Sequence, residues 1–304
     1  MLSGMEWIAA DWGTTNLRVW AIGIDGGILA EASSGDGMAK LERAGFEPAL
    51  TRLIGNWLPK TGAIPVIACG MVGARQGWIE VPYRQAPCRP FSHEQIGIPD
   101  VGDNRLNVRV LPGIKQIAPA DVMRGEETQI AGVLLAQPDF EGVICLPGTH
   151  TKWIKVAAGE ILGFRTFMTG ELFNLLSTHS VLRYSLDDAG WDAAEFASSV
   201  KISAAEPEGF AGRLFAIRAD TLVLGLAPAA ANARLSGALI GAELAAARSY
   251  WLDHDVLIVG NGIQVSLYGE GLLALGKASR ALDASQVTLA GLRSAYTEIR
   301  KDLQ

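Results

Sequence analysis

The sequence predicts an α/β protein made of two related halves. Residues 7–33 read as an apolar strand, a polar turn and two further strands, and residues 142–167 repeat this succession. When the two hairpins are superposed, a Gly-Thr pair falls on a Gly-Thr pair, with Gly13 on Gly148. Short strand-turn-strand units also recur by chance, but the shared Gly-Thr pair favours a duplication. Helix-like and strand-like segments follow each hairpin, so each half should combine a mixed sheet with flanking helices.

The elements after each hairpin follow from the spacing of their apolar residues. Helical spacing over ten or more residues predicts a helix, and a short apolar run predicts a buried strand. In the first half we expect a helix at 46–58, a strand at 64–71 and, within 121–137, a helix whose first turn holds Glu126 and Glu127. In the second half we expect helices at 170–183, 227–252 and 271–282, and a strand at 255–260.

The boundary between the halves should lie near residue 141. No Ser/Pro-rich linker occurs there, so we expect a packed hinge. The predicted domains are an N-terminal lobe over 1–141 and a C-terminal lobe over 142–304, and the last helix could pack back on the N-terminal lobe.

Composition and charge limit the classes of partner. With 304 residues, 49% of them hydrophobic, the chain can bury one large core or two of ordinary size. The formal net charge of -6 argues against nucleic acid or an anionic membrane as a partner, since both need a positive surface. The sequence shows no signal peptide and no membrane-spanning apolar run, so we expect a cytoplasmic protein. The three scattered cysteines indicate neither a disulfide framework nor a zinc site.

The two polar turns have the composition of an anion-binding site. A glycine after a strand can expose consecutive backbone N–H groups, and neighbouring hydroxyls add donors, so phosphate could bind there without a positive side chain. Asp11 ends the first strand and would repel phosphate, which suggests that it holds Mg²⁺ through water, with the ion bridging to phosphate oxygens. In a single hairpin, Asp11 and Asn16 could merely shape an Asx turn. Two such turns instead favour a clamp on a polyphosphate.

Six stretches of the sequence carry a family resemblance. The stretch DWGTTNLRVW resembles the first phosphate motif of the superfamily of sugar kinases, Hsp70 chaperones and actin. Five later stretches, in order and over nearly the whole chain, resemble the 2-dehydro-3-deoxygalactonokinase family: ACGMVGARQGWIEVPY, DVMRGEETQIAG, LPGTHTKW, FMTGELFNLL and RLSGALIGAEL. The resemblance implies the actin-like ATPase fold, with two ribonuclease H-like lobes and the active site in the cleft between them.

The same resemblance implies an activity. Members of this family use ATP, with Mg²⁺, to phosphorylate the terminal hydroxyl of 2-dehydro-3-deoxy-D-galactonate, which gives the 6-phosphate and ADP in galactonate catabolism. ATP and a small sugar acid are then the expected partners, and a homodimer is left open. The alternatives are a kinase of another sugar acid or sugar and, from a different class, a nucleotide-gated binding protein of the Hsp70 or actin type. Against the second alternative, the chain has little length for an appended peptide-binding region.

The resemblance assigns the phosphates to the two turns and adenosine to the late segment VLIVGNGIQVSLYGEG at 256–271, in particular to its glycine-rich turn. The residues concerned are Gly13, Thr14, Thr15 and Asn16, then Gly148, Thr149, His150 and Thr151, and last Gly260, Asn261 and Gly262. Leu146 stands where the first turn has an acid, which leaves Asp11 as the metal organiser. Lys152 could steady a phosphate oxygen or be a solvated flank, and His150 could donate to phosphate or hydrogen-bond across its turn. The glycines of the late turn could be required for conformation alone.

The proton of the accepting hydroxyl needs a base. In this superfamily a carboxylate at the start of a helix leaving the first lobe often takes that role. Glu126 and Glu127 precede a helical run, and neighbours on a helix point about 100° apart, so only one of them can face the site. We choose Glu126, with Glu127 and then Asp121 as alternatives. The helix dipole alone also favours acids in a first turn.

A keto acid also needs a partner for its carboxylate, such as an arginine fork. The candidates are Arg18, Arg75 and Arg124. Arg75 lies in a glycine-rich loop that starts at Gly70 and Met71 and resembles the sugar-contacting loop of the family. Trp78, in the same loop, could stack on the carbon chain or could anchor the core.

Overall fold

The computed structural model describes residues 2–187 and 190–300. Its contacts divide the chain into two units. The first unit comprises Met1–Phe140, Ala158–Leu162 and Ala284–Gln304, and the second comprises Glu141–Ala157 and Gly163–Asp283. The chain therefore returns to the first unit after completing the second.

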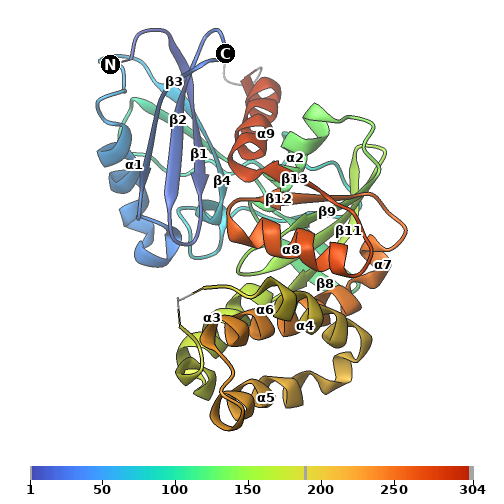
Figure 1. The fold of residues 1–304 in the computed structure, drawn as a ribbon. Coiled ribbons are helices and arrows are strands. Elements are labelled where there is room, and N and C mark those ends of the chain that lie inside the picture. The colour runs from blue at the N-terminus through green and yellow to red at the C-terminus, as the bar shows by residue number, and fades with distance from the viewer. Residues whose placement is uncertain (1, 188–189, 301–304) are drawn as a thin grey trace. The chain divides into compact units, whose positions relative to one another are not determined.

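A five-stranded sheet with the order β3-β2-β1-β4-β6 forms the frame of the first unit (Figure 1). Its strands are β1 (Met5–Trp12), β2 (Leu17–Gly23), β3 (Ile28–Ser34), β4 (Ile64–Gly70) and β6 (Leu106–Val110). Strands β1 to β3 are an antiparallel meander, whereas β4 runs parallel to β1 and β6 parallel to β4. A second, small sheet contains β5 (Arg84–Gln85), β7 (Ile114–Ile117) and β8 (Ala120–Met123).

Strand β1 sends alternate side chains into two separate cores, as the pleat of a strand requires. Trp12 is buried in the core that includes α1 (Phe46–Ile54). Trp7 is buried in the core that includes α9 (Ala284–Ile299), where its ring stacks on Tyr296 at 4.5 Å between centroids. Both faces of the sheet are thereby covered.

Helix α9 is held in the first unit by its contact with α2 (Glu126–Ala136). Gly132 of α2 lies so close to the backbone of Val287, and Gly291 of α9 so close to that of Thr128, that a Cβ at either glycine would overlap the facing carbonyl. Only glycine permits backbones to approach in this way.

The second unit repeats the plan of the first. Its sheet has the order β11-β10-β9-β12-β13, which matches the first sheet strand for strand. The strands are β9 (Gly142–Leu146), β10 (Thr151–Ala157), β11 (Glu160–Phe167), β12 (Val256–Gly260) and β13 (Arg280–Asp283). Again β9 and β10 are antiparallel, and β12 is parallel to both β9 and β13. The prediction of two related halves is confirmed.

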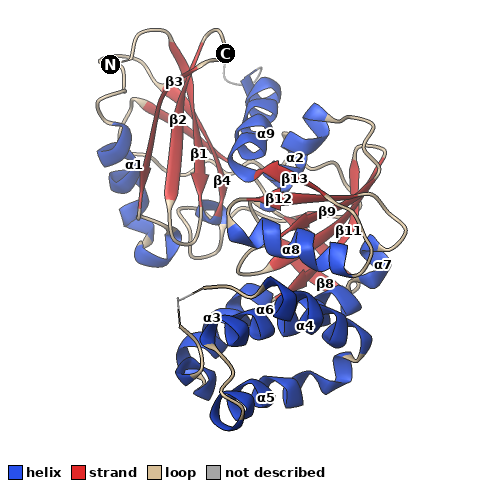
Figure 2. Cartoon of the chain, in the orientation of Figure 1, coloured by secondary structure: helices blue, strands red, loops and turns tan. Residues whose placement is uncertain are grey.

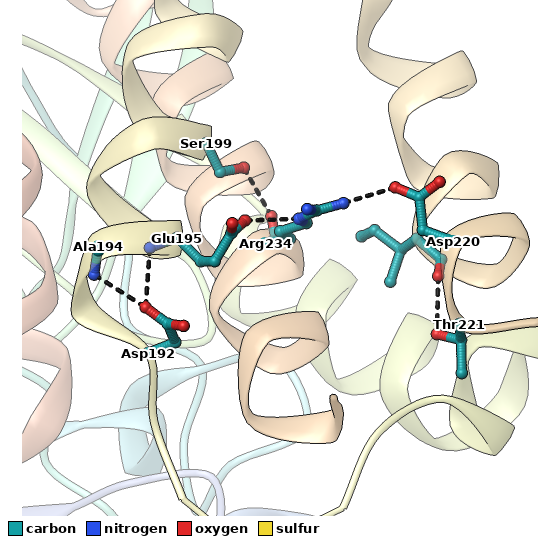
Figure 3. Close-up of polar contacts among 8 residues, drawn as sticks. Asp192, Ala194, Glu195, Ser199, Asp220, Thr221 and Arg234 are labelled. Carbon is teal, nitrogen blue, oxygen red and sulfur yellow. Dashed lines mark hydrogen bonds and ion pairs between the residues drawn. The ribbon is translucent and has the colours of Figure 1, made fainter. Parts of the chain in front are cut away.

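Helices fill the long connection between β11 and β12 (Figure 2). The helices of this unit are α3 (Thr169–His179), α4 (Ala193–Ala205), α5 (Phe210–Val223), α6 (Pro228–Ala246), α7 (Arg248–Trp251) and α8 (Ile263–Ala274). Figure 3 shows how Arg234 of α6 joins two neighbours, with one nitrogen 2.6 Å from Glu195 of α4 and another 2.6 Å from Asp220 of α5. These carboxylates, Glu195 foremost, raise the pKa of the guanidinium.

Two of the predicted segments contain a strand as well as a helix. The segment 121–137 begins in strand β8, and Gly125, at φ 107°, redirects the chain before α2 begins at Glu126, which confirms the predicted place of Glu126 and Glu127 in the first turn of a helix. The segment 271–282 contains the end of α8 and the beginning of β13. Among the described residues, no helix combines the length and the apolar character that crossing a membrane requires.

Candidate functional site

The first turn, residues 13–16, offers backbone N–H groups. Its carbonyl oxygens at 13–15 accept the N–H groups of residues 37–39 at 2.9 to 3.1 Å. By contrast, the N–H groups of Thr14, Thr15 and Asn16 donate to no acceptor among the described residues, and their side chains are exposed. A turn with occupied carbonyls and available N–H groups is suited to an anion.

The second turn, residues 147–150, is backed by the start of α3. The N–H group of Glu171 donates to the carbonyl of Thr149 at 3.0 Å, and Gly170 packs so closely that a Cβ there would lie 2.9 Å from Thr149 Cα. The positive end of the helix dipole therefore adjoins this turn. His150 Nε2 lies 2.5 Å from Glu171 Oε2, so the histidine bonds to the helix rather than across its own turn.

Thr151 and Lys152 are both buried at the start of β10. Thr151 is fully buried, and its Oγ1 lies 2.8 Å from the hydroxyl of Tyr268, so its hydroxyl is engaged within the protein, and its contact with phosphate stays a prediction. Lys152 is 5% exposed, which excludes a solvated flank. In a strand, successive side chains point to opposite faces of the sheet. Thr151 and Lys152 therefore belong to the sheet, and the turn itself consists of the residues before them.

A buried carboxylate connects the elements around the second turn. Glu243 of α6 is 3% exposed and accepts hydrogen bonds from Trp153 Nε1 at 2.7 Å, from the hydroxyl of Tyr268 at 2.7 Å and from the hydroxyl of Thr169. Burial raises the pKa of Glu243, and the three hydrogen bonds oppose that rise. One side chain thereby joins β10, α3, α6 and α8.

A cavity of about 680 Å³ opens beside this network. Its walls come from the second turn and from α3, α6 and α8, and include Gly148, Gly170, Phe173, Asn232, Ile263 and Tyr268. A cavity of this size with mostly apolar walls and a few polar groups is typical of sites for small organic ligands.

The late turn at Gly260, Asn261 and Gly262 lines a different, smaller hollow of about 270 Å³. Gly262 has φ 67°, and a Cβ on Gly260 would lie 2.8 Å from Val265 Cγ2. Conformation therefore favours glycine at 262 and packing against Val265 favours glycine at 260, while the contact of this turn with adenosine stays a prediction. Helix α8, which follows this turn, lines the large cavity with Ile263, Gln264, Leu267 and Tyr268. These residues belong to the late segment 256–271 that is predicted to lie against the nucleotide base, although only its turn residues were named individually.

In the first unit, Asp11 and Arg18 form an ion pair where β1 and β2 approach the first turn. Arg18 Nη2 lies 2.5 Å from Asp11 Oδ2, and Nη1 donates to Ser285 Oγ at 2.8 Å. The thiol of Cys69 lies 3.8 Å from Asp11 Oδ1, and burial, followed by the Asp11 charge, holds the pKa of that thiol well above its usual range. Arg18 is thus engaged with protein groups rather than presented to a substrate.

The start of α2 meets the ends of β1 and β4. A Cβ at Gly125 would lie 3.2 Å from Gly70 Cα, and one at Gly70 would lie 2.6 Å from the carbonyl oxygen of Trp12. This close packing brings Glu126 and Glu127 to the edge of the sheet where the strands end.

The two glutamates at this helix start differ in exposure. Glu126 is partly exposed, and its Oε2 accepts the N–H group of Arg124 at 2.8 Å. Glu127 is 2% exposed, and its two oxygens lie 2.9 and 2.7 Å from the Gly125 nitrogen. Burial, followed by the Glu126 charge, raises the pKa of Glu127 to about 8. Asp121 lies in β8, where its carboxylate accepts the N–H group of Val122 at 2.8 Å.

The loop predicted to contact the sugar begins with a tight turn at Met71–Gly73, directly after Gly70. Arg75 is exposed, and its carbonyl accepts a hydrogen bond from Arg43 at 3.1 Å. Trp78 is 7% exposed and packs against Trp12 and Phe46. Trp78 therefore anchors the core, as one of the two interpretations of the sequence expects, and its contact with a substrate stays a prediction.

Two sheets of identical order, each with a Gly-Thr turn after its first strand, define a protein of the actin-like ATPase and sugar kinase class. The sequence matches the family described as 2-keto-3-deoxy-galactonokinase over residues 11–295. The chain belongs to this family, and it is a kinase, as the sequence predicts.

Individual relatives agree with this membership. A probable 2-dehydro-3-deoxygalactonokinase of Rhizobium meliloti (strain 1021) is 39% identical over 98% of this chain and 99% of the relative. The 2-dehydro-3-deoxygalactonokinase of Escherichia coli (strain K12) is 33% identical over 95% of this chain and 97% of the relative.

Solved structures resemble the chain as well. The crystal structure of a candidate 2-dehydro-3-deoxygalactonokinase from Sinorhizobium meliloti is 38% identical and superposes with a TM-score of 0.89, over 96% of this chain and 99% of that one. An activator of 2-hydroxyisocaproyl-CoA dehydratase from Clostridium difficile, with bound ADPNP, shares the fold at 14% identity and a TM-score of 0.53, over 98% of this chain and 97% of that one.

Proposed function

We propose that this protein transfers the γ-phosphoryl group of ATP to the terminal hydroxyl of 2-dehydro-3-deoxy-D-galactonate, giving the 6-phosphate and ADP. The family match over residues 11–295 supports the reaction. The observation that carries the proposal in the structure is the first turn, whose carbonyls are tied to residues 37–39 and whose N–H groups at Thr14, Thr15 and Asn16 remain available to phosphate.

We assign the nucleotide to the second unit and the first turn. Adenosine would occupy the cavity of about 680 Å³, with Tyr268 held in its wall by Glu243. Gly148 and Thr149 would bind phosphate oxygens, with the N-terminus of α3 favouring their negative charge. Gly13, Thr14, Thr15 and Asn16 would bind the phosphates from the first unit.

Asp11 is our candidate for holding Mg²⁺. Among the described residues no group of three or more His, Cys, Asp or Glu could hold a metal ion. A nucleotide-bound Mg²⁺ needs only one or two carboxylates, since phosphates and water complete its six ligands, so Asp11 fits this requirement. Its Oδ2 is paired with Arg18 at 2.5 Å, which leaves Oδ1 as the oxygen for a water-mediated contact. When bound, Mg²⁺ would supply positive charge to the phosphates.

We assign the base to Glu126. As the terminal hydroxyl oxygen bonds to the γ-phosphorus and the bond to the β-phosphate oxygen breaks, Glu126 would accept the hydroxyl proton. Its partial exposure allows this contact. Burial argues against Glu127 as the base, since its pKa of about 8 keeps it largely protonated near neutral pH.

A coupled assay of ADP release tests the proposal. Purified protein is supplied with ATP, Mg²⁺ and either of the two epimeric acids, 2-dehydro-3-deoxygalactonate or 2-dehydro-3-deoxygluconate. We expect ADP release that depends on the galactonate epimer. Release that is the same with and without either acid would refute the proposal and favour a nucleotide-gated binding protein. Turnover of the gluconate epimer alone would instead indicate a kinase of another sugar acid.

A further inference from the structure

Arg124 is a buried arginine at the junction between β8 and α2. The residue is 8% exposed, so it is more than nine-tenths buried. Its Nη2 donates to the carbonyl oxygen of Val81 at 2.7 Å, and its guanidinium carbon lies 4.2 Å from the ring centroid of Tyr83. The carbonyl and the aromatic ring fix the position of the charge.

The charge of Arg124 is not neutralised by an ion pair. The ion pairs of Arg18, Arg105 and Arg234 each place a carboxylate oxygen within 2.7 Å, whereas Arg124 forms none with the described residues. Its Nε and Nη1 are buried and have no hydrogen-bond partner in the described structure. A buried charge without a partner is costly, so its presence calls for a compensating group.

The guanidinium lies against the loop predicted to contact the sugar. A Cβ at Gly73 would lie 2.8 Å from Arg124 Nη1, so the Met71–Gly73 turn passes directly over the charge. The backbone N–H group of Arg124 donates to Glu126 Oε2 at 2.8 Å. The same residue thus adjoins both the loop and the proposed base.

The other two arginine candidates are less suitable for selecting a carboxylate. Arg18 is occupied by Asp11 and Ser285. Arg75 is exposed, where water and salt weaken the attraction between charges. Arg124 alone of the three combines burial with the absence of an ion pair among the described residues.

We propose that Arg124 is the specificity-determining residue that makes this site prefer a substrate bearing a carboxylate over its uncharged counterpart. This inference rests on the proposed function and adds a residue to it. The buried charge acts through its field beneath the Met71–Gly73 turn, so the carboxylate need not touch the guanidinium. The substrate carboxylate would bring a negative charge to a guanidinium that forms no ion pair with the described residues.

The size of the effect follows from Coulomb's law. At a charge separation of roughly 7 Å and an effective dielectric constant of about 20, the attraction corresponds to on the order of 10- to 100-fold in affinity. An exposed pair separated by water would contribute far less.

The test compares two substrates that differ in one charge. Arg124→Met removes the charge and keeps an extended side chain, and Arg124→Lys keeps the charge. Initial rates are measured with 2-dehydro-3-deoxygalactonate and with its uncharged methyl ester, at saturating ATP. We expect kcat/KM for the acid to fall 10-fold or more in Arg124→Met, through KM, while kcat/KM for the ester stays within about twofold. Arg124→Lys should retain most of the preference.

A matched control is Arg105→Met, which removes the same charge from a partly exposed ion pair with Asp103 in the same unit. The ratio of its kcat/KM for the acid to its kcat/KM for the ester should equal the wild-type ratio. If Arg124→Met lowers kcat/KM equally for the acid and for the ester, the residue has only a structural role and the inference is overturned.

A measurement on the unaltered protein avoids dependence on the folding of a variant. Raising KCl from 0.05 to 0.5 M should change the KM for the acid less than about threefold, because a buried charge is screened weakly. A rise of 10-fold or more would point to an exposed arginine such as Arg75 and overturn the inference. Wild-type protein that phosphorylates neither substrate would refute the proposed function and the inference together.

Discussion

The two turns have the same place in two equivalent sheets, yet the carboxylates near them differ in burial and in hydrogen-bond partners. Beside the first turn, the carboxylate of Asp11 is partly exposed and paired with Arg18 at 2.5 Å. In the second hairpin, Leu146 ends the first strand, and Glu243 is a buried carboxylate bonded to neutral donors. The duplicated backbone therefore carries a partly exposed ion pair in the first unit and a buried hydrogen-bond network in the second, and we propose charge chemistry for the former and positioning for the latter.

Removing the proposed base should have the largest effect and would test the chemical role of the first unit. Glu126→Gln keeps the shape of the side chain but cannot accept a proton, so kcat should fall about 10²- to 10⁴-fold. The KM for ATP should stay within about twofold. Steady-state ADP release measures both. Glu127→Gln is the matched control and should keep most of its turnover. Loss of turnover in Glu127→Gln, together with retained turnover in Glu126→Gln, would assign the base to Glu127 instead.

Removing Glu243 should break the positioning role of the second unit. The variant Glu243→Leu removes the common acceptor of Trp153, Thr169 and Tyr268. Its free energy of unfolding, measured in urea, should be about 3 kcal/mol lower than that of the wild type. The KM for ATP should rise, while the KM for the sugar acid should not. Glu195→Gln weakens a partly exposed ion pair with Arg234, so it should lower the free energy of unfolding by less than about 1 kcal/mol. If Glu243→Leu unfolds at the wild-type urea concentration, the network has no such role.

The buried carboxyl of Glu127 should make stability fall as the pH rises. Its pKa is about 8 in the folded protein against a usual value of 4.5, so between these values the folded state keeps a proton that the unfolded state has released. The free energy of unfolding should therefore decrease from about pH 5 to pH 8 by a few kcal/mol relative to Glu127→Gln, at up to about 1.4 kcal/mol per pH unit. Urea titrations of both proteins at several pH values measure the difference. Parallel pH curves would show that Glu127 is ionised throughout.

His150 should give the smallest effect and would sharpen the description of the second turn. Its pair with Glu171 is exposed, so His150→Ala should lower the free energy of unfolding by less than about 1 kcal/mol. If the histidine serves only this pair, the KM for ATP should change less than about threefold. A 10-fold rise in that KM, without loss of stability, would show instead that His150 donates to phosphate.

The features that the sequence predicted well are local ones. A glycine and hydroxyl side chains after an apolar run determine a turn through neighbouring residues alone, so both hairpins were placed from sequence, and their repetition predicted the two matching sheets. The start of α2 at Glu126 was likewise predicted from the apolar spacing that follows it, whereas the four residues of β8 before Gly125 are too few to reveal a strand by their own alternation.

The features that were missed depend on contacts between distant segments. Arg18 and Ser285 are 267 positions apart, and no residue near Arg18 in the sequence indicates that partner. For Trp78 the sequence offered both a core and a substrate role, and could not decide between them because its burial depends on the packing of Trp12 and Phe46 against it. The large cavity is likewise assembled from α3, α6 and α8, and α6 is buried along most of its length, so its sequence shows no face that would mark the cavity wall.

The placement of α9 has a consequence for the order in which the protein matures during synthesis. Its residues Leu292 and Tyr296 complete the core around Trp7, although they follow the whole second unit in the chain. A ribosome therefore delivers the first sheet long before the helix that covers it. The apolar face around Trp7 stays uncovered while more than half of the chain is made, so the nascent protein should need chaperone protection there rather than folding one unit after the other.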